Sequence, residues 1–270
     1  LGGGESGVGS AILAQKKGFE VFLSDSSPLK EKYKEELRAH NILFEEGQHT
    51  EEIIVSASEI IKSPGIPNYA PIVEKAKAKD IPILSEMEFA KRYTSAKMIC
   101  ITGSNGKTTT ASLVFHILKN AGLNVGLGGN IGKSFARQVA ENNFDYYVLE
   151  LSSFQLENMY TFKADIAILL NITPDHLDRY DHDMNKYIAA KMRITQNQTE
   201  NDALIFWEED PIVSKEIGKL TTRVQKYSFA EHKTGHVAAY SEGDFIYMNT
   251  PEHSFSMDQH ILSLVGTHNL

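Results

Sequence analysis

A glycine-rich segment at residues 102–110 constrains the fold more than any other part of the sequence. It reads Thr-Gly-Ser-Asn-Gly-Lys-Thr-Thr-Thr, follows a strand-like apolar run at residues 98–102 and opens a helical pattern at residues 107–120. A glycine loop between a strand and a helix presents consecutive backbone N–H groups to phosphate oxygens. The segment therefore predicts a phosphate-binding loop in a parallel α/β domain. The alternative is a glycine-rich turn with an incidental lysine.

The residues of this loop suggest separate tasks. Gly103 and Gly106 would let the backbone approach phosphates, while Lys107 would reach the β and γ oxygens and the Thr108 hydroxyl suits Mg²⁺. The spacing Gly-x-x-Gly-Lys-Thr is shorter than the general Gly-x-x-x-x-Gly-Lys-Ser/Thr pattern.

The rest of the chain alternates short strands with helices, which indicates parallel βαβ units and an α/β fold. Before a boundary expected near Ser85, strands are predicted at residues 20–23, 59–61 and 81–84, and helices at 11–17, 29–40 and 70–79. After it, strands are predicted at 98–102, 124–127, 146–151 and 165–172, and helices at 107–120, 134–141 and 184–195. A strand-rich part with a hairpin turning at residues 241–244 follows. We expect a Rossmann-like domain over residues 1–85 and a larger P-loop ATPase-type domain over 86–270.

Composition narrows the class of protein. Asp and Glu number 35 against 27 Lys and Arg, a net charge of −8, which argues against a nucleic-acid partner. The single cysteine, Cys100, allows no internal disulfide, and the longest apolar stretch, near residues 164–170, is too short to span a bilayer. We expect a cytoplasmic protein without a membrane partner.

A second glycine motif lies at the start of the chain. Gly2-x-Gly4-x-x-Gly7 matches the dinucleotide fingerprint, and Asp25 lies near the distance expected for a ribose-binding acid. The motif is compatible with NAD(P), with another nucleotide, or with a tight turn that binds nothing.

Three further residues follow predicted strands or lie on a helix of the larger part. Glu150 ends a predicted buried strand, where a carboxylate could hold Mg²⁺. The alternative is a glutamate that lies at the surface and binds nothing. His176 projects over the same sheet edge, as a ligand or as a structural histidine. Lys191 has the small neighbours Ala189 and Ala190, but from the residues alone it is expected to be a solvated lysine.

Together these motifs resemble the Mur ligases, ATP-dependent amide-bond-forming enzymes of peptidoglycan precursor synthesis. The resemblance rests on the phosphate loop and on the blocks at residues 128–132, 150–156 and 175–179, which read Gly-Gly-Asn-Ile-Gly, Glu-Leu-Ser-Ser-Phe-Gln-Leu and Asp-His-Leu-Asp-Arg. These blocks are most similar to the members that add D-glutamate to UDP-N-acetylmuramoyl-L-alanine through an acyl phosphate. The short phosphate loop is the form that this family uses.

The resemblance implies roles for the site residues. ATP would contact Gly103, Ser104, Asn105, Gly106, Lys107, Thr108, Thr109 and Asn269. One Mg²⁺ would lie on Thr108 and Glu150, and a second on His176 and an N-carboxylated Lys191. The UDP-substrate would contact Glu5, Ser6, Asp25, Ser26, Ser63, Gly65, Asn130, Ser152, Gln155 and His176. Of these, Lys107, Glu150, His176 and Lys191 are the expected catalytic residues.

The family also has a third domain, which carries the amino-acid selectivity, and it is not in this sequence. Both ends look truncated, so we expect residues 1–270 to bind substrates without completing the reaction, as a monomer. The open alternatives are a Mur ligase that adds L-alanine, an NAD(P)-dependent oxidoreductase and a non-catalytic nucleotide-binding module.

Overall fold

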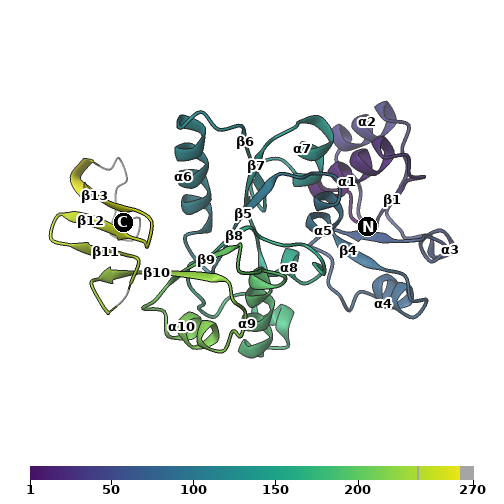
Figure 1. The fold of residues 1–270 in the computed structure, drawn as a ribbon. Helices are drawn as coiled ribbons and strands as arrows, with labels where there is room; N and C mark the ends of the chain where they lie inside the picture. The colour runs from purple at the N-terminus through teal and green to yellow at the C-terminus, as the bar shows by residue number, and fades with distance from the viewer. Residues whose placement is uncertain (236, 262–270) are drawn as a thin grey trace.

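A large, mostly parallel sheet organises the molecule (Figure 1). The structure is a computed structural model that describes residues 1–235 and 237–261. Within these residues the sheet has nine strands in the order β13-β12-β11-β10-β9-β8-β5-β7-β6. The strands are β5 (Lys97–Thr102), β6 (Val125–Gly129), β7 (Tyr146–Glu150), β8 (Ile166–Leu169), β9 (Ala203–Trp207), β10 (Gln225–His232), β11 (Ala239–Glu242), β12 (Phe245–Asn249) and β13 (Ser254–Asp258). Strands β5 to β11 run parallel. Strands β12 and β13 continue the sheet antiparallel, and the turn from β11 to β12 confirms the predicted hairpin.

Helices cover both faces of this sheet because successive strand residues point to opposite faces. Met98 and Cys100 of β5 pack in the core that also holds Phe135 and Tyr187. The intervening residues of β5 pack in a second core, together with Ala111 of α6. The helices of this part are α6 (Lys107–Asn120), α7 (Phe135–Glu141), α8 (Ser153–Leu156), α9 (Met184–Met192) and α10 (Pro211–Gly218), with short 3₁₀ turns η1 (Leu177–Tyr180), η2 (Arg193–Thr195) and η3 (Gln259–Ile261). The predicted α/β class with a mostly parallel central sheet is confirmed.

The N-terminal part is built on two parallel strand pairs, β1-β2 and β3-β4. Its elements are α1 (Glu5–Lys16), β1 (Phe22–Asp25), α2 (Glu31–Ala39), β2 (Leu43–Glu46), α3 (Glu51–Ile54), β3 (Ile60–Lys62), α4 (Pro71–Lys77), β4 (Ile83–Ser85) and α5 (Glu86–Lys91). The two pairs are joined by the first residues of the sequence. Gly2 N–H donates to Ser24 O at 2.9 Å on one side, and Ser63 N–H donates to Leu1 O at 2.9 Å on the other.

Strand β2 was not predicted, and the strand predicted at residues 20–23 lies two residues later, at β1. Leu43 at the start of β2 is 73% exposed and two glutamates end the strand. The strand therefore lacks the alternation of apolar and polar residues by which a strand is predicted from sequence. It forms because it pairs in register with β1, Phe22 opposite Leu43.

The N-terminal and larger parts share a core. Leu13 of α1 is fully buried in the same cluster as Phe135 and Ala136 of α7. Helix α5 leads from β4 to β5, and the two parts share the core just described. Neither feature marks a boundary near Ser85, so that boundary stays a prediction. In the described part of the chain, no helix has the length and apolarity that a membrane crossing requires.

Candidate functional site

The phosphate loop connects β5 to α6, as the sequence predicted. Gly106 caps α6 with φ +82°, a left-handed conformation that favours glycine. The loop is held in shape by the segment that follows β8: Asn105 N–H donates to Asn171 Oδ1 at 2.8 Å, and Asn171 Nδ2 donates to Asn105 O at 3.1 Å. A Cβ on Gly103 would lie 3.0 Å from Leu170 Cβ, so the loop also packs closely on the first residue after β8. These contacts fix a cradle at the carboxyl edge of the sheet.

Thr108 and Glu150 meet at this edge. Thr108 Oγ1 donates to Glu150 Oε2 at 2.7 Å, and Asn130 Nδ2 donates to Glu150 Oε1 at 2.8 Å. Glu150 is 1% exposed, so its interpretation as a surface glutamate is wrong. Lys107 lies beside them and donates its Nζ to Ser104 O at 2.9 Å.

Asn130 reaches Glu150 because the preceding residue is a glycine. Gly129 has φ +99°, and a Cβ there would lie 2.1 Å from Glu150 O. No other residue type fits this close approach of β6 to the end of β7.

The expectation that Lys191 is solvated is wrong. Its side chain is 2% exposed, its Nζ donates to Gly103 O at 2.6 Å, and it lies 4.8 Å above the centre of the Tyr187 ring. Burial, together with the nearby charge of Lys107, lowers the pKa of Lys191 to about 7. The lysine is therefore buried directly beneath the phosphate loop.

His176 lies at the mouth of the site rather than in its interior. Its side chain is 59% exposed and its backbone has φ +51°, a left-handed conformation that is uncommon outside glycine. The ring lies 5.4 Å from that of Phe154, and Nε2 is 3.6 Å from Asp175 Oδ2. The contacts that the structure gives His176 and Lys191 do not include each other.

The protein offers few side chains that could coordinate a metal ion at this site. Among the described residues, no group of three or more His, Cys, Asp or Glu side chains is arranged to hold a metal ion. Mg²⁺ commonly takes one or two carboxylates and completes its shell with substrate phosphates and water. The Thr108–Glu150 pair fits that pattern.

Ser152 and Gln155 cap a helix, a role that was not predicted from the sequence. Ser152 Oγ accepts from Gln155 N–H at 3.3 Å, and Gln155 Oε1 accepts from Ser152 N–H at 3.0 Å. This reciprocal pair is a capping box that begins α8. The spacing Ser-x-x-Gln in the sequence was the signal for it.

At the first glycine turn, Asp25 holds the backbone. Its Oδ2 accepts from Gly3 N–H at 2.6 Å and its Oδ1 accepts from Ser27 N–H at 2.8 Å. Ser63 Oγ is buried and finds no hydrogen-bond partner within residues 1–235 and 237–261. A Cβ on Gly2 would lie 2.6 Å from that hydroxyl, so the turn and the Ser63 loop are closely packed.

The other expected substrate contacts are spread around this turn. Gly65 O accepts from Arg179 Nη1 at 3.2 Å, which ties its loop to η1, and Ser26 is exposed. Ser6 follows Glu5 in the first turn of α1. Asn269, expected at the adenine, lies outside the described residues.

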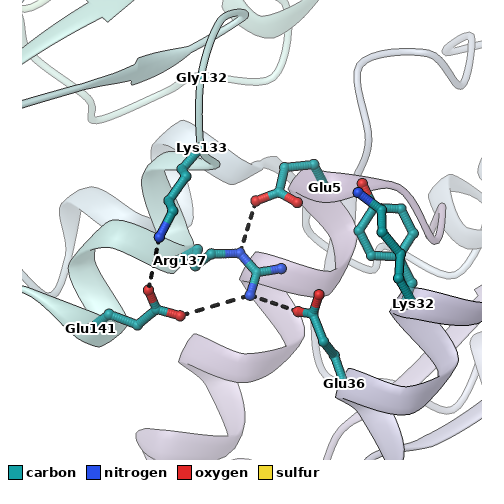
Figure 2. Close-up of a pocket in the computed structure, with 8 residues that line it drawn as sticks. Glu5, Lys32, Glu36, Gly132, Lys133, Arg137 and Glu141 are labelled. Carbon is teal, nitrogen blue, oxygen red and sulfur yellow. Dashed lines mark hydrogen bonds and ion pairs between the residues drawn. The ribbon is translucent and has the colours of Figure 1, made fainter.

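Glu5 faces a pocket that the sequence did not reveal (Figure 2). The cavity measures about 460 Å³ and is lined by Glu5, Lys32, Tyr33, Glu36, Gly132, Lys133, Arg137 and Glu141. Arg137 lies at its centre and contacts Glu5 and Glu36 at 2.8 and 2.7 Å. Because these residues come from α1, α2, α7 and the segment before α7, no local pattern in the sequence could have found them.

With this geometry established, the chain belongs to the Mur ligase family. Residues 101–270 match the family model described as the Mur ligase middle domain. Residues 4–72 match the MurD N-terminal domain. The predicted family is confirmed.

Within the family, the chain is similar to proteins named UDP-N-acetylmuramoylalanine--D-glutamate ligase. It is 60% identical over 270 residues to the one from Bacteroides thetaiotaomicron, a match covering all of this chain and 61% of that protein. It is 56% identical over 272 residues to the one from Porphyromonas gingivalis, covering all of this chain and 60% of that protein. The chain thus spans about three-fifths of the length of these curated relatives.

Solved structures agree on the fold. The UDP-N-acetylmuramate:L-alanyl-gamma-D-glutamyl-meso-diaminopimelate ligase from Neisseria meningitides aligns with a TM-score of 0.65 at 18% identity, covering all of this chain and 87% of that one. The UDP-N-acetylmuramate-alanine ligase MurC from Thermotoga maritima aligns with a TM-score of 0.55 at 20% identity, covering 98% and 60%.

Proposed function

We propose that the protein containing this chain is an ATP-dependent ligase that joins D-glutamate to UDP-N-acetylmuramoyl-L-alanine in peptidoglycan precursor synthesis. The observation that carries the proposal is the hydrogen bond between Thr108 and Glu150 at 2.7 Å, directly beside the phosphate loop. It brings a phosphate cradle and a buried carboxylate to one edge of the sheet. The names of the relatives at 60% identity support the D-glutamate specificity over L-alanine.

Thr108 and Glu150 fit a magnesium ion because both offer the hard oxygen atoms that Mg²⁺ prefers. A first ion would be held by these two residues, and a second by His176 and a carboxylated Lys191. When bound, Mg²⁺ neutralises the charge of the ATP phosphates and of the group being transferred.

The chain's own groups act on the phosphates. The N–H groups that begin α6 would point toward them, and Lys107, whose Nζ now donates to Ser104 O, would leave that carbonyl to contact the β and γ oxygens. Transfer of the γ-phosphoryl group to the substrate carboxylate gives an acyl phosphate. The amine of D-glutamate then attacks the carbonyl carbon, and phosphate leaves as the amide forms.

Lys191 is suited to carboxylation because burial holds its amine partly neutral near pH 7. The neutral nitrogen adds to CO₂, forming an N–C bond and releasing one proton, and the product is an anionic oxygen ligand. That ligand would replace a positive charge that the site stabilises poorly.

The UDP moiety would bind at the first glycine turn, near Asp25, Ser63 and Gly65. The open side of that turn supports this position, and so does the Ser63 hydroxyl, which has no hydrogen-bond partner among the described residues. Asn130, Ser152, Gln155 and His176 would lie toward the muramoyl end. We propose a cytoplasmic location, since the substrates are the nucleotide ATP and a nucleotide-linked sugar, and we propose that the protein is a monomer.

The test measures phosphate release by the whole protein with UDP-N-acetylmuramoyl-L-alanine, ATP and D-glutamate. We expect release that requires D-glutamate and is lost in Glu150→Gln. The matched control, Glu200→Gln, changes an exposed glutamate and should retain activity. Release that proceeds without D-glutamate, L-alanine addition to UDP-N-acetylmuramate, or NAD(P)H-dependent turnover would overturn the proposal.

A further inference from the structure

The carboxylate of Glu5 accepts a hydrogen bond at the start of a helix other than its own. Glu5 is the first residue of α1, yet its Oε1 accepts from Ser134 N–H at 3.3 Å, at the start of α7. Glu86 fills the same end of α7, accepting from Ala136 N–H at 2.9 Å and from Ser134 Oγ at 2.6 Å. Two acidic side chains therefore occupy the positive end of α7, and burial raises the pKa of one of them, Glu86.

The N-terminus of α1 is open by contrast. Its cap is Gly4, which has no side chain to cover the helix end, and a Cβ there would meet nothing within 4 Å. In the part of the chain that the structure describes, the N–H groups of Glu5, Ser6 and Gly7 make no hydrogen bond. An acidic residue at this position ordinarily stabilises its own helix by lying over these groups.

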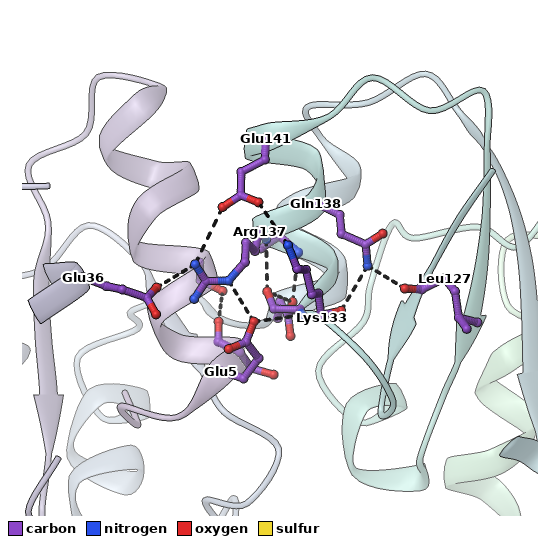
Figure 3. Close-up of polar contacts among 12 residues, drawn as sticks. Glu5, Glu36, Leu127, Lys133, Arg137, Gln138 and Glu141 are labelled. Carbon is purple, nitrogen blue, oxygen red and sulfur yellow. Dashed lines mark hydrogen bonds and ion pairs between the residues drawn. The ribbon is translucent and has the colours of Figure 1, made fainter. Parts of the chain in front are cut away.

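Arg137 is the residue that turns Glu5 away (Figure 3). Its Nε donates to Glu5 Oε1 at 2.8 Å, while its Nη1 lies 2.7 Å from Glu36 and 3.7 Å from Glu141. Its side chain is only 10% exposed, and Nη2 finds no partner among residues 1–235 and 237–261. Burial acts to raise the pKa of Glu5, but the hydrogen bonds and charge of Arg137 outweigh it and lower the pKa, so the carboxylate is ionised.

We infer that Arg137 is a positioning residue for nucleotide binding: it holds the Glu5 carboxylate against α7 and thereby leaves the N-terminus of α1 free for the diphosphate of the substrate. The inference rests on the proposed function, which supplies the UDP group. Without Arg137, the ionised Glu5 is drawn to the N–H groups of its own helix. There it competes with the diphosphate and repels it.

The inference predicts a coupled effect of two residues on one ligand. UDP affinity should fall about tenfold in Arg137→Gln, since the Glu5 carboxylate would then compete with the charged diphosphate for the N–H groups of α1. Adding Glu5→Gln in the same chain should restore most of that affinity. Uridine, which has no phosphate, should bind both variants within about twofold of wild type.

The measurement is isothermal titration of the whole protein with UDP and with uridine. Arg38→Gln is the matched control, because it removes an exposed arginine paired with Glu31 and should leave the UDP-to-uridine affinity ratio unchanged. Circular dichroism checks that each variant folds. If Arg137→Gln does not fold, Arg137→Lys carries the test, with an expected loss of UDP affinity of about threefold and no change for uridine.

Equal losses of UDP and uridine affinity would show that Arg137 is merely structural and would overturn the inference. So would a double variant that stays as weak as Arg137→Gln. A wild-type chain that fails to bind UDP would instead refute the proposed substrate class, and the role of Arg137 would fall with it.

Discussion

Replacing Lys191 by methionine should stabilise the ligand-free chain at neutral pH while destroying its proposed function. The ordinary pKa of lysine is near 10.5, and burial first, then Lys107, lowers the pKa of Lys191 to about 7. At about 1.4 kcal/mol per pH unit, the folded chain bears a cost of about 5 kcal/mol when this lysine is protonated. Methionine keeps most of the volume and removes the charge.

The gain is smaller than the whole cost because the substitution also removes a hydrogen bond. Lys191 Nζ donates to Gly103 O at 2.6 Å, and leaving that carbonyl without a partner costs about 1–3 kcal/mol. We therefore expect Lys191→Met to raise the free energy of unfolding at pH 7 by about 2–4 kcal/mol.

The pH dependence gives the sharper signature. Below about pH 7 both the folded and the unfolded chain hold the Lys191 proton, and the cost is present in full. Between about pH 7 and 10.5 the unfolded chain holds a proton that the folded chain lacks, so wild-type stability rises with pH. Lys191→Met lacks this contribution, and its advantage over wild type should shrink as the pH rises.

The assay is urea unfolding from pH 6 to 9.5 in CO₂-free buffer, followed by circular dichroism. Lys62, whose pKa burial lowers to about 8, contributes its own rise to both proteins and cancels in the difference. Lys119→Met, at an exposed position of α6, is the matched control and should track wild type. A constant difference between Lys191→Met and wild type across this range would refute the reasoning.

Three other substitutions test separate parts of the structure. Lys107→Ala in the whole protein should abolish turnover but leave affinity for the UDP-substrate within about twofold, because the two proposed sites are distinct; comparable losses in kinetics and in titration calorimetry would show the phosphate loop misassigned. Gly129→Ala should lower the free energy of unfolding by more than about 2 kcal/mol in urea titrations, since its Cβ would lie 2.1 Å from Glu150 O. Ser152→Ala should cost about 1 kcal/mol through loss of the capping box, and a variant as stable as wild type would contradict that role.

Local patterns predicted the parts of the fold that local physics determines. Helix α6 begins and ends at the residues predicted, because Gly106 marks its start and the apolar strand before it fixes the loop. Strand β2 was missed because its stability comes from pairing with β1 rather than from burial of its own side chains.

The sequence predicted the site residues whose positions follow from neighbouring strands and known motif spacings. It did not predict those whose positions depend on tertiary packing. Glu150 ends β7 and Thr108 lies just after the neighbouring parallel strand β5, so their meeting could be expected. The burial of Lys191 depends on how α9 approaches the phosphate loop, and the pairing of Glu5 with Arg137 joins residues 132 positions apart. No periodicity in the sequence carries that information.

The packing of α1 on α7 also has a consequence for the order in which the chain can mature during synthesis. Leu13 is buried against residues such as Phe135, which leave the ribosome more than 100 residues later. The hydrogen-bond partners of Glu5, Arg137 and Ser134, are also synthesised much later than Glu5 itself. The first helix therefore cannot complete its contacts by itself, and contacts of such long sequence separation form slowly. We expect the nascent N-terminal part to stay incompletely folded until α7 has emerged.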